Sequence, residues 1–357
     1  MIRHGYNGCA SCHLDPSGGG LLNEFGREEA ADSLRSHYGS EPPPVQPLFG
    51  LFNNPDWLLT GGSFRDMVLL MKTDGAPVQR QNILMQADLR AGIEAGRWRA
   101  AASVGLLTNG NSPAAIVGNL VAREFWAGYT FANDTVLVRG GRINVPFGLR
   151  IIEHTMFVRQ ATRTDINDTQ QYGVALAARR GQFRGELMGI AGNYQAAQDA
   201  VRERGYSGYA EWLPSSHYAF GVSSLVTHAA EDIYLRVPNT RQAHGVTLRL
   251  SPVEPLVVMG EADLVIQAPS GAPRWKGAAT MLQVDLEPWQ GMHAIGAGET
   301  YSSGEPGTGT SWSAWGGLAW FFTSHADARF DYVHQSLSFP GMRIPVDAYM
   351  IQLHVFL

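Results

Sequence analysis

The sequence predicts an all-β chain, a transmembrane antiparallel β-barrel of about 16 strands that follows a small, mostly helical or irregular N-terminal segment. Three observations indicate this fold class. Apolar and polar residues alternate with a period of two from Trp57 to the end. The alternating stretches are roughly 9 to 15 residues long, whereas soluble strands average about 5–6 residues and membrane-barrel strands need about 9–11. Short and long connections also alternate, which is typical of a barrel with turns at one rim and loops at the other.

Composition and charge narrow the class further. A chain of 357 residues is long enough for one large domain or two ordinary ones. A net charge of −5 argues against a nucleic-acid surface, so no nucleic acid is expected as a partner. No apolar run approaches the roughly 20 residues of a transmembrane helix. With transmembrane helices excluded, the sequence predicts a chain that crosses a membrane with β-strands.

The N-terminal segment contains Cys9-Ala10-Ser11-Cys12-His13, the attachment signature of a c-type haem. The thiols of Cys9 and Cys12 would bond to the porphyrin, and His13 would be the axial ligand of the haem iron on one face. A structural zinc site would need four ligands, and a redox Cys-x-x-Cys is expected in a βαβ context. The motif therefore predicts one covalent haem c.

The second axial ligand of the iron is left open by the sequence. His37 and His4 are the first candidates because they lie near the motif. Further candidates in the barrel are His154, His244, His325 and His354. Haem attachment of this kind takes place outside the cytoplasm, so we expect a secretory leader to have preceded Met1.

The sequence predicts that the chain consists of three parts. Residues 1–45 form the haem-binding module, in which the glycines at 18–20 allow unusual backbone dihedrals and a short helix is expected from Leu21 to Tyr38. Residues 46–56 form a linker after a proline run. Residues 57–357 form the barrel, and the module is too small to bury a haem by itself, so we expect it to plug the barrel.

The barrel strands are expected at sixteen places along the chain. These are 57–71, 81–95, 97–109, 121–132, 134–147, 171–180, 182–193, 203–213, 217–229, 243–251, 255–268, 275–287, 290–301, 311–323, 325–338 and 346–357. The longer links between them are expected at 72–80, 108–120, 148–170, 194–202, 230–242, 269–274, 302–310 and 339–345.

Strand number and side-chain phase predict how the barrel is oriented. An even number of strands returns the chain to its starting rim and closes the sheet, so no unpaired edge faces lipid. The module and the C-terminus then share the periplasmic rim. The polar face of the strands predicts a hydrated or plugged lumen with charges of both signs. These residues are Asp88, Arg90, Glu94, Arg97, Arg99, Glu124, Glu186, Glu261, Asp263, Asp327, Arg329 and Asp331.

The stretch from Gly140 to Arg150 ends a strand with Pro146-Phe147-Gly148 before a long loop. This pattern resembles the corresponding point in phosphate-selective-type porins. The resemblance implies that the following loop, residues 149–170, folds inward as a constriction; a long surface loop is the alternative.

The order of the motifs resembles the fused cytochrome-porins of the outer membrane, including the iron-oxidising porin-cytochromes. The shared order is the haem motif, then Phe25-Gly26-Arg27, then a single barrel. The resemblance implies an electron conduit in the bacterial outer membrane, with the haem module on the periplasmic side or within the lumen. Electrons would pass between an external donor or acceptor and a periplasmic cytochrome or other carrier, with Fe(II) oxidation as one form.

Two other functions remain open at this point. The first is a porin-like solute channel in which the haem is a structural plug or sensor. The second is a haem enzyme, such as a peroxidase, an Fe(II) oxidase or a cytochrome c reductase. Outer-membrane lipids are partners in every case, and the sequence leaves the oligomeric state and the direction of electron flow open.

Overall fold

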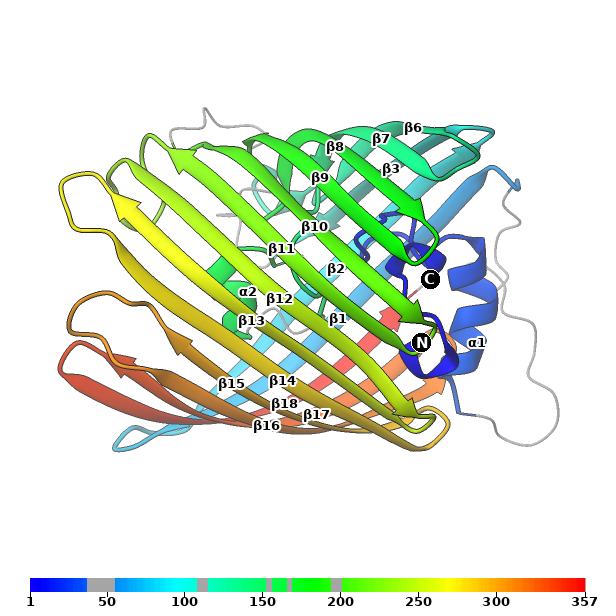
Figure 1. The fold of residues 1–357 in the computed structure, drawn as a ribbon. Helices are drawn as coiled ribbons and strands as arrows, with labels where there is room; N and C mark the ends of the chain where they lie inside the picture. The colour runs from blue at the N-terminus through cyan, green and yellow to red at the C-terminus, as the bar shows by residue number, and fades with distance from the viewer. Residues whose placement is uncertain (37–54, 108–114, 152–155, 166–168, 194–200, 357) are drawn as a thin grey trace.

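The computed structural model shows a closed β-barrel with helical segments at one end and inside it (Figure 1). The structure describes residues 1–36, 55–107, 115–151, 156–165, 169–193 and 201–356.

Sixteen strands make the wall of the barrel. They are β1 (Leu58–Thr73), β2 (Gln79–Ala95), β3 (Trp98–Leu106), β6 (Phe125–Phe131), β7 (Val136–Ile143), β8 (Gln171–Arg180), β9 (Phe183–Gly192), β10 (Glu203–Ser215), β11 (Tyr218–Ala229), β12 (Asn239–Val253), β13 (Leu256–Pro269), β14 (Trp275–Trp289), β15 (Met292–Ser302), β16 (Ser311–Thr323), β17 (Ala326–Phe339) and β18 (Met342–Phe356).

Each wall strand pairs antiparallel with its neighbours, and β1 pairs with β18 to close the barrel. Two short strands, β4 (Ala115–Val117) and β5 (Leu120–Val121), form a small hairpin in the connection between β3 and β6. The sequence predicted a plain loop there. The predicted fold class, an all-β closed barrel of about 16 antiparallel strands, is confirmed.

The connections define two rims, which we call the short-turn rim and the long-loop rim. Turns such as 96–97 and 181–182 lie at the short-turn rim, where β1 begins and β18 ends. At the long-loop rim one expectation was wrong: the link predicted at 339–345 is the two-residue turn 340–341. Gly341 adopts φ 74°, which permits this tight turn and lets both strands run further.

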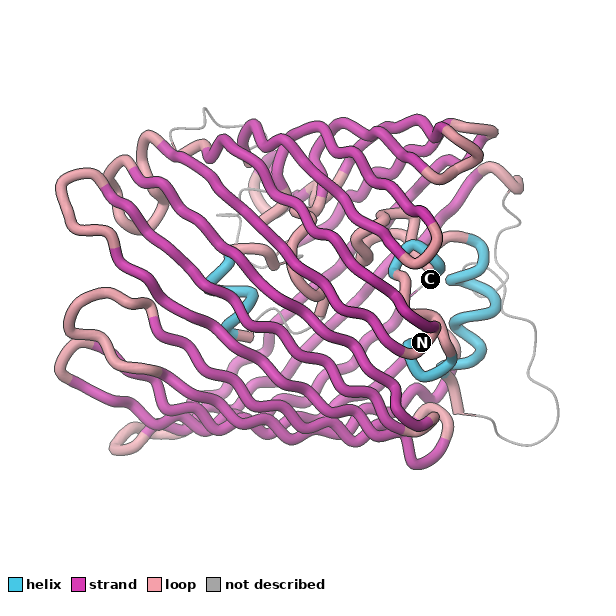
Figure 2. The backbone as a smooth tube through the Cα atoms, viewed as in Figure 1, coloured by secondary structure: helices cyan, strands magenta, loops and turns pink. Residues whose placement is uncertain are grey.

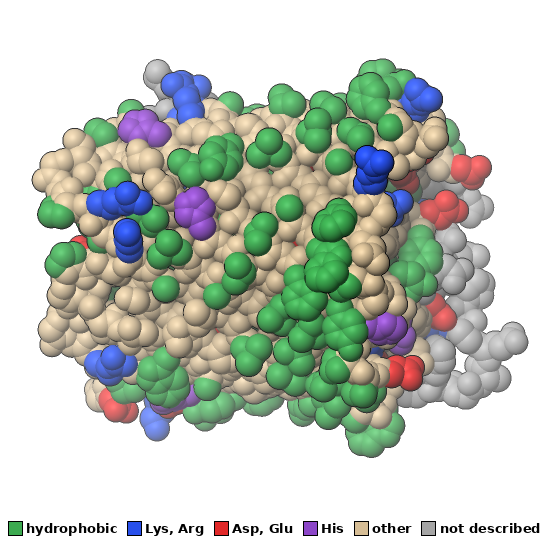
Figure 3. Space-filling model, viewed as in Figure 1, with side chains coloured by type: hydrophobic (Ala, Val, Ile, Leu, Met, Phe, Trp, Pro, Cys, Tyr) green, Lys and Arg blue, Asp and Glu red, His purple; other side chains and the backbone are tan. Residues whose placement is uncertain are grey.

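The outer face of the barrel is apolar. Figure 3 shows hydrophobic side chains spread over the wall and gathered toward the short-turn rim. Aromatic side chains at strand ends near that rim are exposed on the outside. They include Trp57, Trp98, Phe131, Phe183, Trp212, Tyr218, Trp289 and Trp320. Such a belt of aromatic residues is typical of the interface between lipid hydrocarbon and water.

The inner face carries charged side chains, as the alternation predicted. Asp88, Glu186 and Glu261 are each at most 4% exposed, because other lumenal groups cover them. Two strands are shorter than predicted: the stretch 134–147 is a strand only at Val136–Ile143, and the stretch 121–132 is interrupted at 122–124. At this break Arg123 lies inside the barrel, where it pairs with the buried Asp88.

Four short helical segments lie in the N-terminal region, at the short-turn rim (Figure 2). They are η1 (Ile2–His4), η2 (Cys9–Ser11), the π-helix η3 (Gly26–Ala30) and α1 (Ala31–Leu34). The helix predicted from Leu21 begins later, because Leu22 instead forms a β-bridge with His13. A further helix, α2 (Phe157–Thr162), lies within the barrel. In the part of the chain that the structure describes, no helix is long and apolar enough to cross a membrane.

Candidate functional site

Residues 1–36, which we call the plug, are fixed to the short-turn rim at both ends (Figure 1). Near the start, the Arg3 guanidinium forms ion pairs with Asp285 and Glu287 on β14, with N···O distances of 2.8 and 2.9 Å. At the other end, the backbone N–H of Ser36 donates to the carbonyl of Phe321 on β16 at 2.9 Å. The residues between these anchors reach into the lumen.

Two leucines hold the middle of the plug against the wall. Leu14 and Leu21 belong to a buried cluster that includes Leu59 on β1 and Trp126 on β6. Gly92 on β2 makes this contact possible, because a Cβ there would collide with Leu21. Burial of each leucine favours the docked plug by about 2 kcal/mol.

Asp15 anchors the plug electrostatically. It is 1% exposed. Its carboxylate accepts from Arg139 Nη2 on β7 at 2.8 Å and from Asn144 Nδ2 at 3.2 Å. Burial raises the pKa of Asp15, but the Arg139 charge and hydrogen bond lower it by more, so the net pKa lies below the usual range. The same guanidinium also pairs with Glu186 on β9 at 2.6 Å. Plug and wall thus share one buried ion network.

The Cys-x-x-Cys-His segment forms the tight turn η2 at the entrance of this lumenal part. The backbone N–H of His13 donates to the carbonyl of Cys9 at 3.0 Å, and both cysteines are free thiols. The glycines at 18–20 have φ values of 92°, 80° and 68°, which confirms the expected unusual dihedrals. Gly18 passes so close to the thiol that a Cβ would lie 3.2 Å from Cys9 Sγ.

The imidazole of His13 is buried and uncharged. Burial lowers the pKa of His13 to about 4, and the Asp15 carboxylate offsets only part of this effect. The ring is therefore neutral at pH 7, the form that binds metals. Its Nδ1 is buried without a hydrogen-bond partner among the described residues. A neutral imidazole directly after two free thiols fits the donor set of a c-type haem.

The lumen wall next to Cys9 is basic. Arg184 Nη2 on β9 lies 3.5 Å from Cys9 Sγ, and Arg249 Nη1 on β12 lies 4.0 Å from it. Burial raises the pKa of Cys9, but these two charges lower it by more, so the net pKa falls. Burial raises the pKa of Cys12. The two thiols of the motif therefore lie in different electrostatic environments.

Among the described candidates for the second ligand, the structure places none beside His13. His37 lies outside the described residues. His4 is exposed in η1, and its charged neighbours include Arg3 and Glu287. The charged neighbours of His13 are Asp15, Arg90 and Arg150. The second ligand therefore stays a prediction.

The described histidines of the barrel have other contacts. His354 Nδ1 lies 2.9 Å from Asp327, and His325 Nδ1 lies 3.1 Å from the carbonyl of Phe356. His244 contacts Ser224 at 3.0 Å. His154, the fourth barrel candidate, lies outside the described residues.

The described residues between β7 and β8 fold into the lumen, as the resemblance to porins implied. Its described residues, 144–151, 156–165 and 169–170, include α2, and we call them the inward segment. The guanidinium of Arg159 in α2 forms a buried ion pair with Glu261 on β13, whose other oxygen accepts from the Leu149 N–H at 2.8 Å. Met156 and Val158 pack in a buried cluster against strands β14 to β17.

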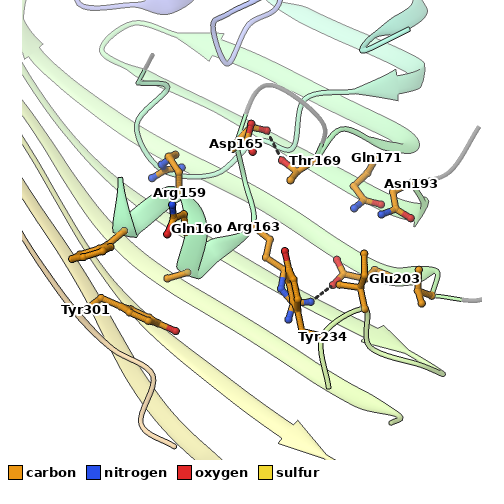
Figure 4. A pocket seen from close by; sticks show the side chains of 14 residues that line it. Arg159, Gln160, Arg163, Asp165, Thr169, Gln171, Asn193, Glu203, Tyr234 and Tyr301 are labelled. Atoms are coloured by element: carbon orange, nitrogen blue, oxygen red, sulfur yellow. Dashed lines mark hydrogen bonds and ion pairs between the residues drawn. The ribbon is translucent and has the colours of Figure 1, made fainter. Parts of the chain in front are cut away.

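A cavity of about 640 Å³ lies between the inward segment and the strand ends at the long-loop rim (Figure 4). We call it the vestibule cavity. Its lining includes Phe157, Arg163, Gln171, Asn193, Tyr234 and Tyr301. The sequence did not point to these residues, because they come from α2, loops and the ends of several strands. Predicting that these residues line one cavity would have required the register of the strands in the closed barrel.

Short turns at one rim, an inward-folded segment and sixteen antiparallel strands define a porin-type barrel. Solved structures agree with this class. The chain is similar to the anion-selective porin from Comamonas acidovorans, with a TM-score of 0.65, 9% identity, and coverage of 84% of this chain and 99% of that one. It is similar to the outer membrane channel DcaP of Acinetobacter baumannii, with a TM-score of 0.63, 11% identity, and coverage of 86% and 99%.

A third similar structure is a loop-deletion mutant of OmpT, an outer membrane protein of Vibrio cholerae, with a TM-score of 0.62, 10% identity, and coverage of 84% and 99%. At these identities the likeness shows the fold. No protein-family model and no curated protein sequence matches the chain.

Proposed function

We propose that this chain is a porin-like channel of the bacterial outer membrane whose lumen is narrowed from both rims. The inward segment narrows it on the long-loop side and the plug on the short-turn side. The observation that carries this proposal is the buried ion network of Asp15, Arg139 and Glu186, which holds the plug inside a closed, polar-lined barrel.

We also propose that the plug carries the haem. Cys9 and Cys12 would hold the porphyrin through thioether bonds, and His13 would ligate the iron. When bound, the haem supplies a one-electron redox centre. The chain's own residues orient this group, because Leu14, Leu21 and Asp15 fix the adjacent backbone to the barrel wall.

Channel function is tested by conductance in planar lipid bilayers. The wild-type protein is expected to give small unitary currents. Asp15→Asn is expected to give larger currents or to open more often, because the plug is held less firmly. Folding of each protein is checked by its migration on unheated detergent gels. A folded barrel that conducts in neither form would overturn the channel proposal.

A second candidate function is electron transfer across the membrane, and the Cys-x-x-Cys-His motif favours it. Cys9 Sγ lies beside Arg184 and Arg249 of the lumen wall, so a haem bound there would be at the lumen entrance, not free in the periplasm. The partners would be a periplasmic cytochrome or other carrier and an external donor, with Fe(II) as one case, or an external acceptor.

Sealed proteoliposomes distinguish the two functions. An electron conduit reduces ferricyanide trapped inside when Fe(II) is added outside, while a trapped dye is retained. Cys9→Ala/Cys12→Ala is the control, since it has no thiol for haem attachment. A colourless wild-type protein, or equal ferricyanide reduction by the control, would refute electron transfer and leave the channel proposal intact.

A further inference from the structure

One wall of the vestibule cavity carries hydrogen-bond acceptors that lack partners among the described residues. Gln171 is 5% exposed and its Oε1 is unpaired, and the buried Oδ1 of Asn193 is unpaired as well. The pairing of Tyr172 with Gly192 sets these two amides side by side at the ends of β8 and β9 (Figure 4). A buried unpaired polar atom costs about 1–3 kcal/mol. These oxygens are therefore in place for donors of a ligand.

Across the cavity the lining is aromatic (Figure 4). The rings of Phe157 and Tyr301 have centroids 6.0 Å apart. Tyr234 is 72% exposed, and the Arg163 guanidinium lies 4.6 Å from its ring centroid. Aromatic faces of this kind pack against the apolar face of a ring-shaped ligand.

Both arginines at the cavity are engaged by carboxylates. Arg163 pairs with Asp232 at 3.0 Å and with Glu203 at 3.4 Å, and Arg159 pairs with Glu261. Burial raises the pKa of Asp232, but the hydrogen bonds and charge of Arg163 lower it by more, so Asp232 stays ionised. With both arginines engaged, the described lining residues offer no unpaired cation to an anionic ligand. The described lining thus disfavours an anionic ligand.

We propose that the vestibule cavity binds a neutral polyhydroxylated ring, that is, a mono- or disaccharide. Its hydroxyls donate to Gln171 and Asn193, and its C–H face packs on Tyr234 and Tyr301. The volume of about 640 Å³ lies within the roughly 300–1,000 Å³ of ligand pockets. This inference rests on the proposed channel function, since it names the solute class that the channel selects.

Calorimetric titration of the full chain in detergent with maltose tests the proposal. Sodium succinate serves as the anionic probe and choline chloride as the cationic probe. Maltose is expected to bind saturably, whereas neither charged probe is expected to bind. Gln171→Leu is expected to weaken maltose binding at least tenfold, and Tyr234→Ser about fivefold. Tyr234 is an exposed loop residue, so this second variant keeps the test valid even if Gln171→Leu does not fold.

Gln283→Leu is the matched control. Gln283 on β14 is also 5% exposed with an unpaired Oε1, but it does not line the cavity. It is expected to change maltose affinity less than twofold. No saturable maltose binding, preferential binding of a charged probe, or an equal loss in the control would overturn the sugar site. Binding in detergent needs no conduction, so a failed sugar site and a failed channel are separate results.

Discussion

At the scale of single residues, Asp15 shows how the plug is held. A buried carboxylate is stabilised only if hydrogen-bond donors and an opposite charge surround it. Here the charged Arg139 and the neutral amide of Asn144 supply them. Removing one member of such a network leaves the others buried without full compensation. The plug should therefore depend on this residue more than on any ion pair at the surface of the plug.

Asp15→Asn is expected to weaken docking of the plug by about 2 kcal/mol, because Arg139 keeps Glu186 but loses its charged partner in the plug. Limited proteolysis of the N-terminal segment in detergent measures the effect. Asp32→Asn is the control, since Asp32 is 36% exposed and, among the described residues, pairs with Arg35 at 2.6 Å. Equal cleavage rates in the two variants would show that Asp15 does not anchor the plug.

Docking of the plug is also expected to depend on pH. The pKa of Asp15 is lowered in the docked state, so its contribution is complete above the ordinary pKa of about 3.9 and is lost as the pH falls through the lowered value. Hydrogen exchange of residues 12–22, corrected for the intrinsic rate, measures this loss. The difference between wild type and Asp15→Asn should shrink below about pH 4. A difference that grows on acidification would contradict the assignment.

At the scale of elements, a buried ion pair anchors the inward segment in the same way that the ion network anchors the plug. Arg159 and Glu261 have side chains that are 2% and 0% exposed. The helix α2 spans only Phe157–Thr162, which is too short to be stable alone, so tertiary contacts must hold it. Arg159 on α2 and Glu261 on β13 are therefore one of the contacts that hold the constriction in place.

Arg159→Gln is expected to release the inward segment from the wall. Breaking a buried pair by removing one partner costs about 3 kcal/mol, so exchange of amides in 157–162 should accelerate about 100-fold. Arg236→Gln is the control, because Arg236 is 66% exposed and pairs with Glu231 at 3.4 Å in an outer loop. Unchanged exchange in Arg159→Gln would mean that apolar packing alone holds α2.

At the scale of the whole molecule, an apolar outer face and an aromatic belt near the short-turn rim fit the barrel to a membrane. Closure by β1 and β18 leaves no wall strand with an unpaired edge. The cost of a charge on this face should therefore depend on its depth in the bilayer.

Ile351→Arg places a charge on the outer face near the middle of β18. It is expected to destabilise the folded barrel by about 2–4 kcal/mol, whereas Val253→Arg at the short-turn rim should cost about 0–1 kcal/mol. The two residues are 58% and 56% exposed, which makes them a matched pair. Urea unfolding in lipid vesicles gives both free energies. Equal costs would argue against a membrane-embedded wall.

The wall was predictable from the sequence because a strand that separates lipid from a polar lumen must alternate at every step. That local rule placed the ends of β8 and β16 at the residues where the structure has them. The alternation rule was less accurate where tertiary contacts or a tight turn override the local pattern. Arg123 turned inward to reach Asp88, and the link predicted at 339–345 became a tight turn at Gly341.

The candidate site was predictable only in part. The sequence by itself determined the local spacing of Cys9, Cys12 and His13 ahead of a barrel, and this spacing predicts haem attachment because the covalent bonds need residues at fixed local spacing. The tertiary structure alone decided that Asp15 meets Arg139 and that Gln171 lies across a cavity from Tyr301. These contacts join residues more than 100 positions apart, and their geometry is set by barrel closure and register, which no local pattern encodes.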